Sequence, residues 1–183
     1  MAEHAGVCLD TRHGFVMFEN LKDVVKNYAS AGIEICRIQV SNSLVVDPMD
    51  ETSLTELREF DDDVYLHQVC VNSADGVLQY LDLPKAIKAA QQDGLFGREW
   101  RIHYHVPVFE NKFGCLQSNH NELGEFLRAT KLEQFTDLLE VETYTFHILP
   151  PTYKKLPMTE LIAQEMNWTY SCANGLIESA GRI

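Results

Sequence analysis

The sequence is poor in basic residues, with 15 Lys and Arg against 27 Asp and Glu and a formal net charge of −12. A charge of this sign repels phosphate backbones and anionic lipid surfaces, so nucleic acid is not an expected partner. No apolar run approaches the roughly 18 residues of a membrane-spanning helix, and none after Met1 resembles a secretory signal. We therefore expect a cytoplasmic protein without a membrane span.

Paired cysteines are also missing, because the five cysteines are scattered and none forms a Cys-x-x-Cys motif. This usage favours reduced thiols over a disulfide framework or a zinc ribbon. Glycine and proline are few, at 10 and 6, and 45% of the residues are hydrophobic, which is typical of one globular domain. The 183 residues nevertheless fall short of the roughly 250 that close a β/α barrel.

The first part of the chain has the pattern of a strand, a helix and a second strand. A short apolar run from Val7 to Leu9 ends at Asp10, and apolar residues then recur at helical spacing from Leu21 to Tyr28. Residues 33–40 alternate as a strand. The separation of the two strands matches a right-handed crossover of about 30 residues, which predicts that they are parallel neighbours.

The rest of the chain continues the alternation of strands and helices. The segments 42–98 contain a predicted β-hairpin around Asp75-Gly76 and look like an insertion. The strands of this hairpin are 64–71 and 77–80. Other predicted elements are a helix at 84–92, a strand at 99–109, a helix after Asn119, a strand at 138–145 and a helix at 159–173. This order predicts an α/β fold with a largely parallel sheet.

Polar side chains gather where the predicted strands end, which is where α/β folds carry their chemistry. They are Asp10 and His13, Gln39 and Ser41, His103 and His105, and Glu140 and Glu142. Carboxylates and imidazoles that converge at one end of a sheet can hold a divalent cation. Mixed oxygen and nitrogen ligands suit Mn²⁺, Co²⁺ or Zn²⁺ better than Ca²⁺.

Each of these features also has a structural explanation. Asp10 is equally well explained as a turn carboxylate that binds nearby amides. His103 and His105 lie about 7 Å apart on one side of a strand and could line a pocket that holds no metal. Glu140 and Glu142 would also be accommodated on a wet face of an open sheet, and His67 is more typical of a hairpin histidine whose hydrogen bonds are satisfied.

Five segments in a fixed order resemble one protein family. They are Val7 to His13, Arg37 to Ser41, Val64 to Val69, Glu99 to Pro107 and Leu139 to Thr145. The sequence resembles metabolite traffic proteins of the EboE type, a family of the xylose isomerase-like TIM-barrel superfamily. The resemblance implies that residues 1–183 form one domain, the C-terminal part of a (β/α)8 barrel, with roughly strands six to eight and an inserted β-hairpin.

The resemblance also implies a metal site. Asp10 falls on the metal ligand of the sixth strand and Glu142, or Glu140 in a shifted register, on that of the eighth. For the seventh strand Gln39, His67 or His105 could be the ligand, and we favour His105, which lies 37 residues before Glu142. The fourth family ligand, a fifth-strand Glu, would precede Met1. The implied metal is Mn²⁺, Zn²⁺, Co²⁺ or Mg²⁺.

The implied activity is that of a sugar phosphate isomerase or epimerase, in which carboxylates move a proton between adjacent sugar carbons. Glu142 and His13 would be the catalytic residues, and Arg12, His103 and His67 would contact the substrate. The alternatives are a non-catalytic metabolite-binding protein and a structural remnant of a truncated barrel. A partial barrel is further expected to self-associate or to pair with an N-terminal half-barrel.

Overall fold

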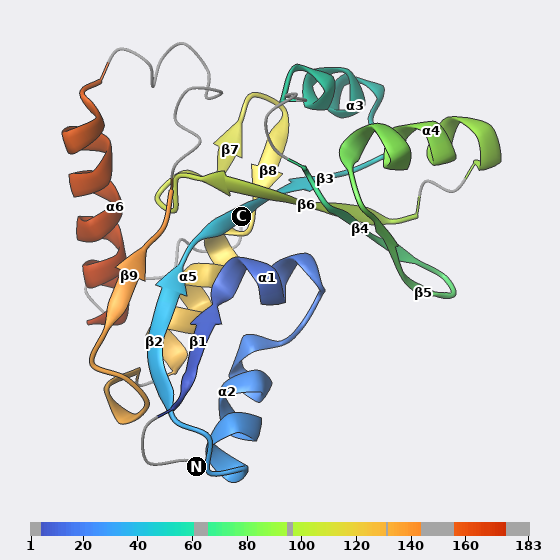
Figure 1. Cartoon of the computed structure of the whole chain (residues 1–183). Coiled ribbons are helices and arrows are strands. Elements are labelled where there is room, and N and C mark those ends of the chain that lie inside the picture. Colours follow the sequence, from blue (N-terminus) through green and yellow to red (C-terminus); the bar gives the residue numbers. More distant parts are fainter. Residues whose placement is uncertain (1–4, 61–65, 95–96, 131, 144–155, 175–183) are drawn as a thin grey trace.

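The computed structural model describes residues 5–60, 66–94, 97–130, 132–143 and 156–174 (Figure 1). Among these residues, strands form a three-stranded sheet in the order β1-β2-β9 and a six-stranded sheet in the order β5-β4-β6-β3-β8-β7. The strands are β1 Val7–Asp10, β2 Ile35–Val40, β3 Asn42–Val46, β4 Val69–Ser73, β5 Gly76–Tyr80, β6 Glu99–Val106, β7 Lys112–Phe113, β8 Leu116–Ser118 and β9 Leu139–Val141. The α-helices are α1 Thr11–Val16, α2 Leu21–Ser30, α3 Glu51–Leu57, α4 Leu83–Asp93, α5 His120–Ala129 and α6 Met158–Ala173.

The three-stranded sheet is parallel throughout, and its strands lie side by side in chain order. β2 pairs in parallel with β1 on one side and with β9 on the other. The prediction that the first two strands are parallel neighbours is therefore confirmed. Helix α2 between them begins where the Asn20 side chain accepts a hydrogen bond from the Lys22 amide at 3.0 Å, and the chain reverses after it at Gly32, whose φ is +68°.

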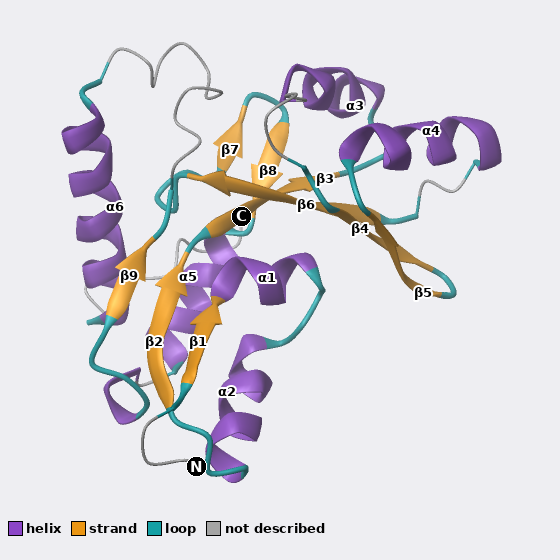
Figure 2. Ribbon diagram, in the orientation of Figure 1, coloured by secondary structure: helices purple, strands orange, loops and turns teal. Residues whose placement is uncertain are grey.

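Helices cover one face of this parallel sheet. Leu9, Ile38 and Val40 are buried in a core that they share with residues of four helices. The helical residues are Phe15 of α1, Leu21 and Val25 of α2, Leu123, Phe126 and Leu127 of α5, and Cys172 of α6. In Figure 2, α5 lies behind β2, and no described helix lies in front of β2 and β9.

The opposite face of the parallel sheet is polar and open to solvent. Cys8 is exposed, and the side chains of Arg37 and Glu140 keep 44% and 43% of their accessible surface. Their ion pair, with 2.9 Å between Arg37 Nη1 and Glu140 Oε2, lies on this face. Within the described residues, the sheet is therefore a half-covered layer rather than the middle of a sandwich.

The six-stranded sheet is antiparallel in every pairing among the described residues. The prediction of a largely parallel sheet is therefore wrong for this second sheet. The strand predicted at Glu99 to Phe109 belongs to it and not to the parallel sheet. The hairpin of β4 and β5 is confirmed around Asp75-Gly76. The segment outside the parallel sheet runs from β3 to β8, beyond the 42–98 expected for an insertion.

The helices expected after Pro84, after Asn119 and near residues 159–173 are present as α4, α5 and α6. The last strand, β9, is shorter than expected, and residues 144 and 145 of the prediction lie outside the described residues. In the described ranges, no helix combines the length and apolar character needed to cross a membrane.

Candidate functional site

Asp10 ends β1 and begins α1, and its carboxylate makes the contacts that organise the site. Its Oδ1 accepts hydrogen bonds from the amides of Arg12 at 2.9 Å and His13 at 3.3 Å, which caps the helix. The same oxygen accepts a bond from the Ser41 hydroxyl at 3.2 Å. An Asp directly after a short apolar strand thus joins two strand ends and one helix.

Arg12 lies next to this carboxylate and is buried, with 3% of its surface exposed. Its Nη2 pairs with Asp10 Oδ2 at 3.2 Å. Arg12 was expected to contact substrate, and the structure instead places its guanidinium below the surface as the counter-ion of Asp10. His13 Nε2 lies 3.5 Å from the same oxygen, and its side chain is 61% exposed.

Three imidazoles form a row that links α1 to the antiparallel sheet. The ring centroids of His13 and His103 are 4.7 Å apart, and those of His103 and His105 are 5.8 Å apart. Burial, followed by the charge of Arg12, lowers the pKa of His103 to about 3 and that of His105 to about 4. Both imidazoles on β6 are therefore neutral at pH 7.

Glu142 follows β9 and faces the same cluster. Its carbonyl accepts a hydrogen bond from His105 Nδ1 at 2.9 Å, which connects the two sheets. Burial, and then the charge of Asp10, raises the pKa of the Glu142 carboxyl above its ordinary value. Its buried Oε2 has no hydrogen-bond partner among the described residues. A carboxyl group in this setting is suited to accept or donate a proton.

Gln39 and Glu140 continue the row that Asp10 begins. Asp10 pairs with Gln39 in the register of β1 and β2, and Gln39 pairs with Glu140 in that of β2 and β9. Neighbours in register point to the same face of a sheet, so the three side chains share the open face. Gln39 thus comes from β2, the strand beside β1, whereas His105 reaches the cluster from the other sheet.

His67 was expected to contact substrate, and the structure does not bring it to the cluster. It is 2% exposed and stacks on Tyr104, with ring centroids 3.9 Å apart. Tyr104 alternates with His103 and His105 along β6 and points to the opposite side of the strand. The amide of His67 donates to Asp82 Oδ1 at 2.9 Å. These contacts place His67 in the core against Tyr104, away from the row of His13, His103 and His105.

A run of buried polar residues also supports the site, and Ser41 is the one member of the run that the sequence analysis counted among the site's polar side chains. Thr11 Oγ1 accepts from the Ser41 amide at 3.0 Å, which fixes the start of α1 against the end of β2. Asn42 Nδ2 donates to Ser118 Oγ at 3.0 Å, and Ser43 contacts Asn119. Ser41, Asn42 and Ser43 are fully buried where the chain passes from one sheet to the other. Three consecutive small polar residues after an apolar strand are the only sequence signal for this role.

The donors at the cluster have the chemistry of a divalent-cation site, because Asp10 and Glu142 offer oxygen and His105 offers nitrogen. In the part of the chain that the structure describes, however, no three His, Cys, Asp or Glu side chains are arranged to hold a metal ion. Asp10 is engaged by Arg12, Ser41 and the start of α1. The described side chains thus supply suitable ligands without gathering them around one point.

The low pKa values of His103 and His105 predict a pH-dependent stability. In the unfolded chain each imidazole binds a proton as the pH falls below about 6.5, whereas the folded chain leaves it neutral. The free energy of unfolding should therefore decrease as the pH falls from about 6.5 to about 4. Urea unfolding of the wild type, His103→Gln and His105→Gln at several pH values measures this, and each variant should lose less stability on acidification. Identical pH dependence in all three proteins would contradict the buried, neutral assignment.

Comparison with known proteins adds no relative to this description. No family model matches the chain, and neither a curated protein nor a solved structure matches it. The assignment of function therefore depends on the residues and contacts of the cluster and on the sequence resemblance.

Proposed function

We propose that this chain is a divalent-metal-binding protein of the EboE type, similar to sugar phosphate isomerases and epimerases, and that it handles a small polyhydroxylated metabolite. The observation that carries the proposal is the row of Asp10, Gln39 and Glu140 on the open face of three parallel strands. Glu142 and the imidazole of His13 lie at the carboxyl end of the same strands. This is the position of active sites in β/α barrels.

The roles of the residues follow from their surroundings. Glu142 is the group that takes or returns a proton, because its raised pKa and its unbonded Oε2 suit both steps. His13 is exposed and can donate to a ligand hydroxyl or phosphate. Arg12 holds Asp10 in place from below. Neutral His103 can accept or donate one hydrogen bond without adding charge.

Asp10, His105 and Glu142 are the residues that would hold the cation. Such a cation would polarise hydroxyl and carbonyl oxygens of a bound sugar. The contacts that already engage Asp10 leave its carboxylate only in part available, so protein ligands beyond these three are needed for tight binding.

The open face supports the further proposal that the described fold is a partial TIM barrel. Parallel sheets occur almost only with both faces covered, whereas this one is covered on one face in the described residues. β1 and β9 also each have one edge without a described strand. An N-terminal half-barrel or a second copy of the chain would cover these edges and complete the site.

Metabolite binding without turnover is the second candidate. Among the described residues, Glu142 is the one site carboxylate with a buried oxygen that lacks a hydrogen-bond partner and is also free of an ion pair. Proton transfer between sugar carbons normally needs a base on one side and an acid on the other. A single available carboxylate favours binding over efficient catalysis in the chain alone.

Metal binding is expected to be measurable and weak. In calorimetric titrations with Mn²⁺ or Zn²⁺, the affinity for the metal should decrease about tenfold or more in Asp10→Asn and in Glu142→Gln. Each substitution removes a charged ligand. Asn retains a helix-capping oxygen at position 10 but loses the ion pair with buried Arg12, so circular dichroism first verifies that the variant is folded. Glu140→Gln is the matched control, because it makes the same change of charge at the residue that would be the ligand in the shifted register of the last strand. Equal affinities of the wild type, Asp10→Asn and Glu142→Gln would remove both residues from the metal site.

Catalysis by the chain alone is expected to be absent. One available carboxylate lacks the opposing acid that contributes roughly 10²- to 10⁴-fold to such reactions. Incubation with fructose or its phosphate in D₂O with Mn²⁺ should therefore give no deuterium incorporation above background. Robust exchange that Glu142→Gln abolishes would show that the site of the isolated chain is complete.

A further inference from the structure

We propose that the exposed apolar flank of helix α6 is the interface of a homodimer, in which α6 of one chain packs antiparallel against α6 of a second copy. α6 stands at the outer edge of the fold, next to β9 (Figure 1). The interface uses none of the residues to which metal or metabolite binding is assigned above. The inference is therefore independent of the proposed function.

A row of large apolar side chains lies on the exposed surface of α6. Its members, which we call the α6 row, are Met158, Ile162, Met166 and Tyr170, with exposed fractions of 59%, 39%, 59% and 65%. They recur every four residues, so they lie one above the other along the helix. α6 has 16 residues and is about 24 Å long, and the row runs along most of it. A contiguous exposed apolar surface marks an interaction site, which scattered apolar residues do not.

α6 is anchored to the body of the protein on another side, so the α6 row belongs to a firmly packed helix. Leu161 and Cys172 are buried in the two hydrophobic cores. Glu165 is also buried, and its Oε1 accepts hydrogen bonds from the Val108 amide at 3.2 Å and from Thr143 Oγ1 at 2.5 Å. These contacts fix the direction in which the row points.

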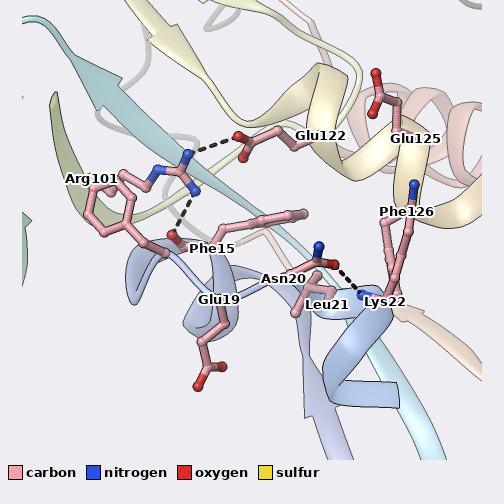
Figure 3. Close-up of a pocket in the computed structure, with 10 residues that line it drawn as sticks. Phe15, Glu19, Asn20, Leu21, Lys22, Arg101, Glu122, Glu125 and Phe126 are labelled. Atoms are coloured by element: carbon pink, nitrogen blue, oxygen red, sulfur yellow. Dashed lines mark hydrogen bonds and ion pairs between the residues drawn. The ribbon is translucent and has the colours of Figure 1, made fainter. Parts of the chain in front are cut away.

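The helix that supports α6 is fixed as well. α6 packs against α5, and Arg101 of β6 ties α5 to the rest of the fold. Arg101 Nη2 pairs with Glu122 of α5 at 2.8 Å, and its Nη1 donates to the carbonyl of Phe15 in α1 at 3.0 Å (Figure 3). A surface that is already ordered loses little conformational entropy when it binds. The α6 row is therefore preformed for docking.

The charge around the α6 row points to a second copy as the partner. α6 contains no Lys, Arg or His, and its two acids are the buried Glu165 and Glu160. Glu160 is two residues from both Met158 and Ile162, and side chains at that spacing do not face the same side of a helix. Chains with a net charge of −12 repel each other over most of their surfaces, whereas two α6 rows meet without facing charges.

Other occupants match this surface less well. Helices that lie on anionic membranes are rich in Lys and Arg, which α6 lacks. A basic protein would find no carboxylate within the row to recognise.

The order of the side chains favours antiparallel packing about a two-fold axis. The axis would lie between Ile162 and Met166, so that Met158 of each copy meets Tyr170 of the other copy. A methionine sulfur packs favourably against an aromatic ring, and antiparallel helices oppose their dipoles. Both copies use the same surface, so this association closes at two chains.

Sedimentation equilibrium of the full chain tests the proposal. We expect a monomer–dimer equilibrium, in which the dimer has twice the mass of the 20.9 kDa monomer. Met166→Glu places a charge near the centre of both rows and should raise the dimer Kd about tenfold or more, because like charges then face each other. Met49→Glu is the matched control, since Met49 is 72% exposed and lies before α3, and it should leave the Kd unchanged.

Methionine oxidation locates the interface in the wild-type protein. Dilute hydrogen peroxide converts exposed methionines to sulfoxides, and mass spectrometry of peptides gives the rate at each residue. At concentrations that favour the dimer, Met158 and Met166 should be oxidised severalfold more slowly than in the monomer. Met49 should be oxidised at the same rate in both states.

Three results would overturn the proposal. They are a wild type that stays monomeric at every concentration, association that Met166→Glu does not weaken more than Met49→Glu does, and oxidation of Met158 and Met166 that association does not slow. The second and third results would place the contact elsewhere, such as at the strand edges. Metal titration of the same proteins tests the proposed function separately. Met166 is a surface residue, so Met166→Glu should keep the wild-type fold, which circular dichroism verifies.

Discussion

The three parallel strands have a helical layer on one face only, and the position of the candidate site depends on this constraint. Leu9, Ile38 and Val40 turn toward the helices, so the alternate residues of the same strands must face outward. Those residues include Asp10, Gln39 and Arg37, and they are polar. A sheet of this kind is stable as a layer against α2 and α5, and it leaves a polar surface that suits a ligand or a second polypeptide.

The second sheet gives this open face its imidazoles. β6 carries His103 and His105 onto α1, and Asp10 holds α1 at the end of β1. Glu165 of α6 connects the segments that follow β9 and β6, because its Oε1 accepts from Thr143 Oγ1 at 2.5 Å and from the Val108 amide at 3.2 Å. Burial raises the pKa of Glu165 to about 6. The carboxyl thus fixes the residue next to Glu142 while lying inside the core.

Local patterns predicted many of the elements, but not α1, β3, β7 or β8, and they could not predict with which strands β6 pairs. The spacing of apolar residues and the Asn20 cap gave α2, and Asp75-Gly76 gave the hairpin, because these signals are contained in short segments. The partner of a strand is not encoded in a short segment. The strand predicted at Glu99 to Phe109 was therefore assigned to the parallel sheet, although β6 pairs antiparallel with β3 and β4. His103 and His105 nevertheless lie in the same cluster as Asp10. Their position on a different sheet and the burial of Arg12 depend on tertiary packing, which no spacing in the sequence encodes.

The open face and the free edges of β1 and β9 can be tested together by the association state of the isolated chain. Exposed strand edges and uncovered apolar side chains, such as Met158, Met166 and Tyr170 on α6, promote contacts between molecules. Light scattering over a range of protein concentrations, combined with binding of a hydrophobic dye, measures this directly. The partial-barrel account predicts a mass that rises above that of the 20.9 kDa monomer and strong dye binding. A monodisperse monomer that binds no dye would contradict it.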